Sequence, residues 1–186
     1  ARLPVSPTDR DAAAEAELEL RRRQAKAIRV LRDFIPGCEK AFIARTSPAL
    51  CIRRGRCVTC DYDVSLDDVC EGRRFGDEVM VYGFHDRAPK YKVKDGGVYG
   101  LPYRALRPKG LDNLLVAGML VTSDYLAHQS TRNTVCCMGQ GQAAGTAAAL
   151  MADQGATSRS LPYADVRKAL VADGVYFEGG GSPHSK

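Results

Sequence analysis

The sequence predicts a mixed α/β fold, an α+β fragment in which helices accompany two kinds of strand. Residues 79–103 alternate apolar and polar side chains, as half-buried antiparallel strands do. Residues 111–118 form a short apolar run that ends in glycine, which is typical of a strand buried on both faces. Residues 139–150 open with glycines and continue as an alanine-rich helix. At 186 residues, the chain is long enough for one domain and short for two.

Amphipathic helices frame these strands. Apolar side chains recur at helical spacing over residues 9–34, where the sequence at 6–9 offers a cap and Pro36 ends the run. The same spacing recurs over residues 163–172. Between the two helices, Ser65 is followed by aspartates, which predicts the start of a short helix.

These patterns divide the chain into five segments. They are a long helix at 1–38, a substrate or cap region with strands at 39–110, a strand and glycine-rich helix at 111–155, a terminal helix and strand at 156–178, and a flexible tail at 179–186.

Charge and hydropathy exclude some classes of function. The net charge of +5 is spread among acidic residues, so we expect no nucleic-acid surface. The longest weakly polar run is about eight residues, far below the roughly 20 that a membrane span needs. Residues 110–155 hold a single basic residue, Arg132. We expect that segment to be buried or to face a large ligand.

The seven cysteines cannot all pair within the chain, because their number is odd. Cys57 and Cys60 have the spacing of a metal-binding pair, but the chain has no second such pair. Three interpretations stay open, namely ordinary thiols, a disulfide, and a metal or cluster site that also uses Cys51 and Cys70. We predict that no metal is bound.

The glycine-rich helix start at 139–144 predicts a ligand cradle. A helix N-terminus presents unpaired N–H groups and a partial positive charge. Small residues at Gly141, Ala144, Gly145 and Ala148 leave one helix face nearly bare, so another group can approach its backbone closely. Close packing of the helix against a strand requires the same small residues, and this alternative stays open.

Three separated motifs carry a resemblance to a known family. They are residues 101–118 (LPYRALRPKGLDNLLVAG), residues 130–132 (STR) and residues 138–150 (MGQGQAAGTAAAL). They resemble the carboxy-terminal portion of the FAD-dependent oxidoreductase family with the glutathione-reductase-like flavin fold. Residues 53–62, 67–75 and 85–86 resemble the middle region of the same family. The likeness covers about residues 15–175.

The resemblance implies FAD as the cofactor and a fold that another chain completes. The family's GxGxxG fingerprint, which holds the FAD pyrophosphate, does not occur in this sequence. A companion polypeptide would therefore carry that half. Our chain would supply the last strand and helix of a Rossmann-like FAD domain and part of an antiparallel substrate or cap domain. It would be a carboxy-terminal subunit or a processed chain of a heteromeric oxidoreductase, inactive alone, that moves a hydride from a small organic substrate to FAD.

The resemblance also implies which residues meet the cofactor. They are Ala117, Gly118, Met119, Gly141, Gln142, Ala143 and Ala144. Met119 stands where many relatives place Arg or Asp, so the side-chain contact there departs from the family's pattern. Backbone N–H groups at 142–144 would meet the flavin N1 and C2 carbonyl, where negative charge accumulates on reduction.

Acid–base and charged residues complete the predicted catalytic set. His85 and His128 are the candidate bases for the proton that accompanies hydride transfer. Arg132 would contact the flavin or an anionic substrate, unless it pairs structurally with Asp124 or Asp112.

Arg56, Tyr103 and Arg104 are the predicted substrate residues, with packing or a surface ion pair as the alternative at each. Two other functions stay open. One is a non-catalytic assembly or regulatory subunit of a flavoprotein complex, and the other is a cysteine-ligated metal or cluster electron carrier.

Overall fold

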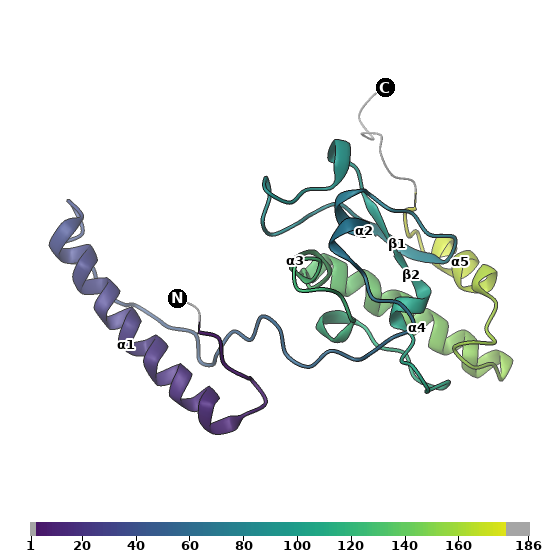
Figure 1. The fold of residues 1–186 in the computed structure, drawn as a ribbon, viewed down its shortest axis with the longest axis horizontal. Coiled ribbons are helices and arrows are strands. Elements are labelled where there is room, and N and C mark those ends of the chain that lie inside the picture. Colours follow the sequence, from purple (N-terminus) through teal and green to yellow (C-terminus); the bar gives the residue numbers. More distant parts are fainter. Residues whose placement is uncertain (1–2, 178–186) are drawn as a thin grey trace. The chain divides into compact units, whose positions relative to one another are not determined.

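The computed structural model describes residues 3–177, which form two compact units (Figure 1). The N-terminal unit ends at Arg56 and the C-terminal unit begins at Cys57. This boundary falls inside the region at 39–110 that the sequence pattern left undivided.

One long helix, α1 (Arg10–Phe34), dominates the N-terminal unit and lies where the sequence predicted it. The side chain of Asp9 caps it by accepting hydrogen bonds from the N–H groups of Asp11 and Ala12, each at 3.1 Å. Ala16 is the buried residue of this helix. The amphipathic pattern therefore forms a helix without forming a core.

The segment after α1 runs back beside the helix as irregular chain. Arg21 donates a hydrogen bond to the hydroxyl of Thr46 at 2.9 Å, and Arg32 donates to the carbonyl of Ala41 at 2.6 Å. The large side chains of Phe34 and Phe42 remain 74% and 73% exposed. Polar contacts, rather than apolar burial, thus hold this segment to the helix.

An antiparallel pair of strands lies at the centre of the C-terminal unit, and helices pack against it (Figure 1). Strands β1 (Glu78–Tyr82) and β2 (Tyr99–Pro102) form the sheet. This confirms the antiparallel strands predicted over residues 79–103, and the 3-10 turn η1 (Lys94–Gly96) lies between the two strands. Helices α4 (Thr134–Gln154) and α5 (Tyr163–Ala172) both contact β1 and each other.

The shorter helices agree with the sequence patterns. Helix α2 (Leu66–Cys70) starts at a capping box in which Ser65 and Asp68 each bond to the backbone N–H of the other. Helix α5 (Tyr163–Ala172) buries Val166 and Leu170 completely. Single turns complete the unit: α3 (His128–Thr131) and the 3-10 turns η1 (Lys94–Gly96), η2 (Tyr103–Leu106) and η3 (Gly118–Leu120).

Helix α4 (Thr134–Gln154) begins five residues earlier than the sequence predicted. Glycine costs about 1 kcal/mol in a helix interior, which is why a helix start was expected at Gly139. The structure gives that glycine another role. A Cβ at Gly139 would lie 2.7 Å from the sulfur of Met80, so the absence of a side chain lets α4 pack closely on β1.

The predicted buried strand at 111–118 is also wrong for the described residues, which form no strand there. Val116 donates one backbone hydrogen bond to Leu106 at 2.9 Å, and Leu111 and Leu114 are nearly half exposed. A parallel strand requires hydrogen-bonding neighbours on the sheet. Residues 3–177 supply parallel pairing only as isolated bridges, from Val58 to Val121 and from Val64 to Ser123. The strand expected within 156–178 is likewise absent up to residue 177, and the predicted tail at 179–186 lies outside the described residues.

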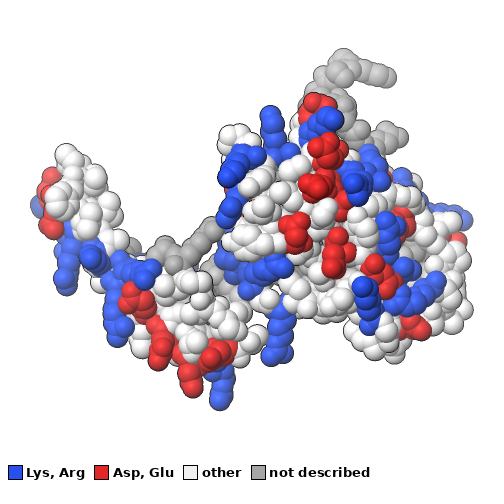
Figure 2. All heavy atoms as spheres, in the orientation of Figure 1, with Lys and Arg blue, Asp and Glu red and all other residues white. Residues whose placement is uncertain are grey.

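Surface charge is mixed on the face that Figure 2 shows. Lysine and arginine side chains alternate with aspartate and glutamate over both units. No helix within residues 3–177 combines the length and the apolar character that crossing a membrane requires.

Candidate functional site

Polar side chains gather around helix α3, in the chain segment that leads into α4. All of them are buried except that of Asp86, which is 24% exposed. We call the following residues the α3 cluster: His85, Asp86, Tyr99, Ser123, His128, Gln129, Ser130, Thr131 and Arg132. Burying a polar group costs free energy unless the group is hydrogen-bonded, and an apolar residue would fill the same space without that cost. A concentration of buried polar groups therefore indicates a role beyond packing. Their concentration here identifies the candidate site.

Tyr99 and Ser130 form the floor of the cluster. Ser130 donates a hydrogen bond to the carbonyl of Phe84, so the Tyr99 hydroxyl is the donor in its 2.8 Å bond to Ser130. Complete burial raises the pKa of Tyr99 well above its ordinary value. The phenol therefore remains protonated and acts as a fixed donor.

His85 joins the loop after β1 to the turn before α3. Its Nε2 lies 3.0 Å from the carbonyl of Leu126, which requires a proton on Nε2. Its Nδ1 then accepts a 3.0 Å hydrogen bond from the N–H of Arg87. Both ring nitrogens are thus bonded to backbone groups, an arrangement that favours a structural role for this histidine.

His128 is completely buried within the cluster. Its Nδ1 lies 3.5 Å from the hydroxyl of Ser123, which in turn lies 3.2 Å from that of Thr131. The Ser123 hydroxyl is therefore one of the groups that place this imidazole.

Arg132 pairs with Asp86, and not with either predicted partner. Its Nη2 donates hydrogen bonds to the Asp86 carboxylate and, at 3.2 Å, to Oε1 of Gln129. Asp124 instead accepts from the backbone N–H groups of Leu126 and Ala127, each at 2.8 Å. The predicted pairing failed because Asp86 lies 46 residues away in sequence, and tertiary structure alone brings its loop to α3.

Asp112, the other predicted partner, lies on a separate surface network. Its carboxylate accepts a 2.7 Å hydrogen bond from Arg159, whose guanidinium also pairs with Asp61. Both aspartates that the sequence suggested as structural partners of Arg132 thus bond to other groups.

One donor of the Arg132 guanidinium, Nε, has no partner within residues 3–177. The side chain is 6% exposed, and Nε is buried without a hydrogen bond among the described residues. A buried unpaired donor costs about 1–3 kcal/mol. An acceptor from a bound group would remove that cost.

The N-terminus of α4 follows directly after Arg132. The side chain of Asn133 does not cap the helix, because its Nδ2 donates backwards to the carbonyls of Gln129 and Ser130, each at 3.0 Å. The first N–H groups of an uncapped helix have no partner within the helix and carry partial positive charge. The positive end of this 21-residue helix thus begins two residues after Arg132 in the chain.

Gln140 fixes the turn at Gly118 to helix α4. It is completely buried, accepts a 2.7 Å hydrogen bond from the Gly118 N–H and donates a 2.8 Å bond to the carbonyl of Thr131. Gly118 has a φ of 80°, which favours glycine. Sequence analysis missed Gln140, although a glutamine on the inner face of an alanine-rich helix is a signal for a buried hydrogen bond.

The predicted cofactor residues have different environments in the structure. Residues 141–144 lie inside α4, where backbone N–H groups bond within the helix, so the expectation that they offer free donors is wrong. Gly141 and Gln142 are exposed, Ala144 is half-buried and Ala143 is completely buried. The Gly118 N–H is already bonded to Gln140, while Ala117 is half-buried and Met119 is 42% exposed.

The predicted substrate residues do not join the α3 cluster. Arg104 is paired with Asp77 and lies over the rings of Tyr62 and Phe75, with distances of 4.7 and 5.2 Å to the ring centroids. Tyr103 is buried. Its hydroxyl has no hydrogen-bond partner among residues 3–177.

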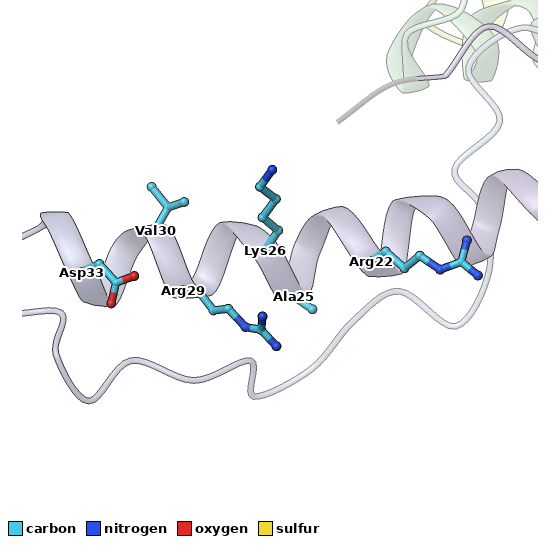
Figure 3. A pocket seen from close by; sticks show the side chains of 6 residues that line it. All are labelled: Arg22, Ala25, Lys26, Arg29, Val30 and Asp33. Atoms are coloured by element: carbon cyan, nitrogen blue, oxygen red, sulfur yellow. The ribbon is translucent and has the colours of Figure 1, made fainter.

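Arg56 is the last residue of the N-terminal unit, so its position relative to the cluster is not defined. The same unit has a shallow hollow beside α1, lined by Arg22, Ala25, Lys26, Arg29, Val30 and Asp33. All six residues come from one helix, and Figure 3 shows their side chains pointing in different directions. They do not converge on a ligand, so we do not regard this hollow as the functional site.

All seven cysteines are free thiols. Within the part of the chain that the structure describes, no three His, Cys, Asp or Glu side chains gather as a metal site. Burial raises the pKa of Cys136 to about 12, which makes this thiol unreactive at neutral pH.

The sequence of the chain matches one known protein family. The model of the family described as FAD dependent oxidoreductase matches residues 2–170, nearly the whole chain. The chain matches no curated protein and no solved structure.

Proposed function

The chain belongs to the FAD-dependent oxidoreductase family, whose cofactor is FAD, and on this premise we propose that it forms the flavin-facing, carboxy-terminal portion of a heteromeric oxidoreductase. FAD, when bound, would supply the redox chemistry by accepting a hydride from a small organic substrate. The residues of this chain would position the flavin and the substrate and would handle the accompanying proton.

The observation that carries this proposal is the buried Nε of Arg132, which has no partner among the described residues, two residues before the uncapped start of α4. A flavin offers carbonyl oxygens and ring nitrogens that accept hydrogen bonds and gain negative charge on reduction. Donors at Thr134, Val135 and Cys136, together with Arg132, fit such a group. The proposed donors thus lie in the first turn of α4 and not at residues 142–144.

His128 is our proposed proton acceptor, since its ring is completely buried in the α3 cluster and lies within 3.5 Å of the Ser123 hydroxyl. His85 would act on the fold, by holding the loop that carries Asp86. Tyr103 is a proposed substrate-pocket residue because its buried hydroxyl lacks a partner among the described residues. We also propose Arg56 and Arg104 as substrate contacts, the second through a guanidinium that Asp77 already pairs with.

The exposed face of α4 supports completion by another polypeptide. Val135 and Met138 are 65% and 68% exposed, and a Cβ added at Gly141 or Gly145 would meet nothing within 4 Å. An apolar, bare helix face of this kind suits close packing against another backbone. We propose that the polypeptide carrying GxGxxG packs on this face and completes a Rossmann-like domain.

The test is the absorbance of the assembled protein, purified through this chain. Flavin bands near roughly 370 and 450 nm are expected, as a flavin cofactor implies. Arg132→Met should lower turnover per assembled complex at least about tenfold, because a charge-assisted hydrogen bond contributes roughly 1.5–3 kcal/mol. A complex without flavin would support the alternative of a non-catalytic assembly subunit. A broad cluster absorbance would support the electron carrier.

A further inference from the structure

The ion pair between Arg132 and Asp86 is surrounded by additional hydrogen bonds that charge neutralisation alone would not require. Asp86 is bonded twice to the α3 region, through its carboxylate to Arg132 and through its N–H to the carbonyl of Gln129 at 3.3 Å. Gln129 in turn accepts from Arg132. These contacts fix both the guanidinium and the loop that carries its counter-charge.

The contacts leave a specific part of the guanidinium available. Nη2 serves Asp86 and Gln129, while Nε is buried and has no partner within residues 3–177. A guanidinium is a rigid planar fork, so fixing Nη2 also fixes the direction of the Nε–H bond. The pair therefore presents an oriented donor that carries little net charge.

The field of Arg132 extends to the first turn of α4. Burial raises the pKa of the Cys137 thiol, and the positive charge of Arg132 opposes that rise. The carboxylate of Asp124, another acid near α3, accepts hydrogen bonds from the backbone N–H groups of Leu66, Leu126 and Ala127. Asp86 is thus the acid placed to balance Arg132.

We propose that Asp86 is a positioning residue, which orients Arg132 toward the flavin and cancels enough of its charge to lower the flavin's reduction potential. This inference rests on the proposed function, since it places Arg132 beside FAD. Asp86 itself would act through Arg132 and would not touch the cofactor. Arg132 with its counter-charge offers a hydrogen bond to a neutral acceptor, such as a flavin carbonyl oxygen.

Replacing either member of the pair should shift the flavin's reduction potential, and the two replacements should shift it in opposite directions. In Asp86→Asn, the unbalanced charge of Arg132 favours the reduced flavin, which carries more negative charge. In Arg132→Met, the unbalanced carboxylate disfavours it. We expect at least a tenfold change in the preference for reduced over oxidised flavin in each case, which is a shift of about 30 mV for a two-electron couple. A purely structural pair would lower stability in both variants without opposite shifts.

The experiment measures the two-electron midpoint potential of bound FAD in the assembled protein. Glu78→Gln is the matched control, because Glu78 is a buried carboxylate that pairs with Arg74 on another part of the C-terminal unit. It should lower the melting temperature and leave the potential unchanged. A rise in Asp86→Asn with a fall in Arg132→Met supports the proposal. Shifts of the same sign, or none beyond the control, overturn it.

A further variant covers a failure of Asp86→Asn to assemble. Gln129→Glu adds a negative charge at the same guanidinium with little change in shape, and it should lower the potential. An unchanged potential in that variant overturns the proposal. A wild-type complex without flavin would overturn the proposed function and this inference with it, whereas normal flavin content with unshifted potentials would overturn this inference alone.

Discussion

The two units form helices equally well but bury them very differently. Leu170 of α5 and Tyr99 of β2 are completely buried in the C-terminal unit, whereas Phe34 of α1 is 74% exposed in the N-terminal unit. Both helices, α1 and α5, were predicted from the same apolar spacing. The comparison teaches that periodicity identifies the apolar face of a helix, while only the rest of the structure determines whether that face is covered.

The largest expected difference between the units lies in their apolar side chains. Leu170→Ala should lower the free energy of unfolding by about 2–5 kcal/mol, because it leaves a cavity in the core of the C-terminal unit. Leu18→Ala, at a position of α1 that is 55% exposed, should change it by no more than about 0.5 kcal/mol. Chemical denaturation of both variants measures this. Equal losses would show that the apolar face of α1 is buried in solution.

Two glycines of α4 sharpen the comparison between its inner and outer faces. Gly139→Val should cost about 1–3 kcal/mol through overpacking against Met80. Gly145→Ala should instead stabilise the chain by up to about 1 kcal/mol, because a Cβ there meets open space and alanine favours the helix. Thermal unfolding compares the two. If Gly145→Ala stabilises the chain yet lowers its flavin content on assembly, the outer face receives the second polypeptide.

Alkaline pH should weaken the C-terminal unit through Cys136. The folded pKa of this thiol is about 12, against an ordinary value of 9.0, so the folded chain keeps the proton while the unfolded chain loses it. Stability should therefore fall as pH rises from about 9 toward 12, by up to about 1.4 kcal/mol per pH unit from this group. Cys136→Ala should show a shallower fall between pH 8 and 10.5. Equal slopes would mean that Cys136 ionises in the folded protein.

The smallest predicted effect concerns the cap of α1. Asp9→Ala should cost about 1 kcal/mol of helix stability, because it leaves the N–H groups of Asp11 and Ala12 without an acceptor. Asp9→Asn keeps an acceptor oxygen and should be nearly neutral. Circular dichroism reports the helix content of both variants, and a loss in Asp9→Asn equal to that in Asp9→Ala would show that charge, and not the hydrogen bond, stabilises the helix start.

Local patterns predicted the elements whose formation depends on local forces. The cap at Ser65, the helix ending before Pro36 and the apolar face of α5 each depend on a few adjacent residues, and each lies where it was expected. The helix start at Gly139 was placed wrongly, because the sequence does not show that Met80 packs against that glycine. The run at 111–118 was assigned as a strand from hydrophobicity, which does not provide the neighbours that a strand requires.

The same distinction between local and long-range forces applies to the candidate site. The sequence by itself determined that the segment at 110–155 has one basic residue and that the family is that of FAD-dependent oxidoreductases, because composition and motif spacing are properties of the linear chain. Only the tertiary structure decided that Arg132 pairs with Asp86, that Gln140 holds the turn at Gly118, and that the free end of α4 lies at Thr134. Those contacts join residues up to 46 positions apart. The energy of a buried charge or hydrogen bond depends on which groups surround it in space. The distance between two residues along the sequence does not determine whether they are such neighbours.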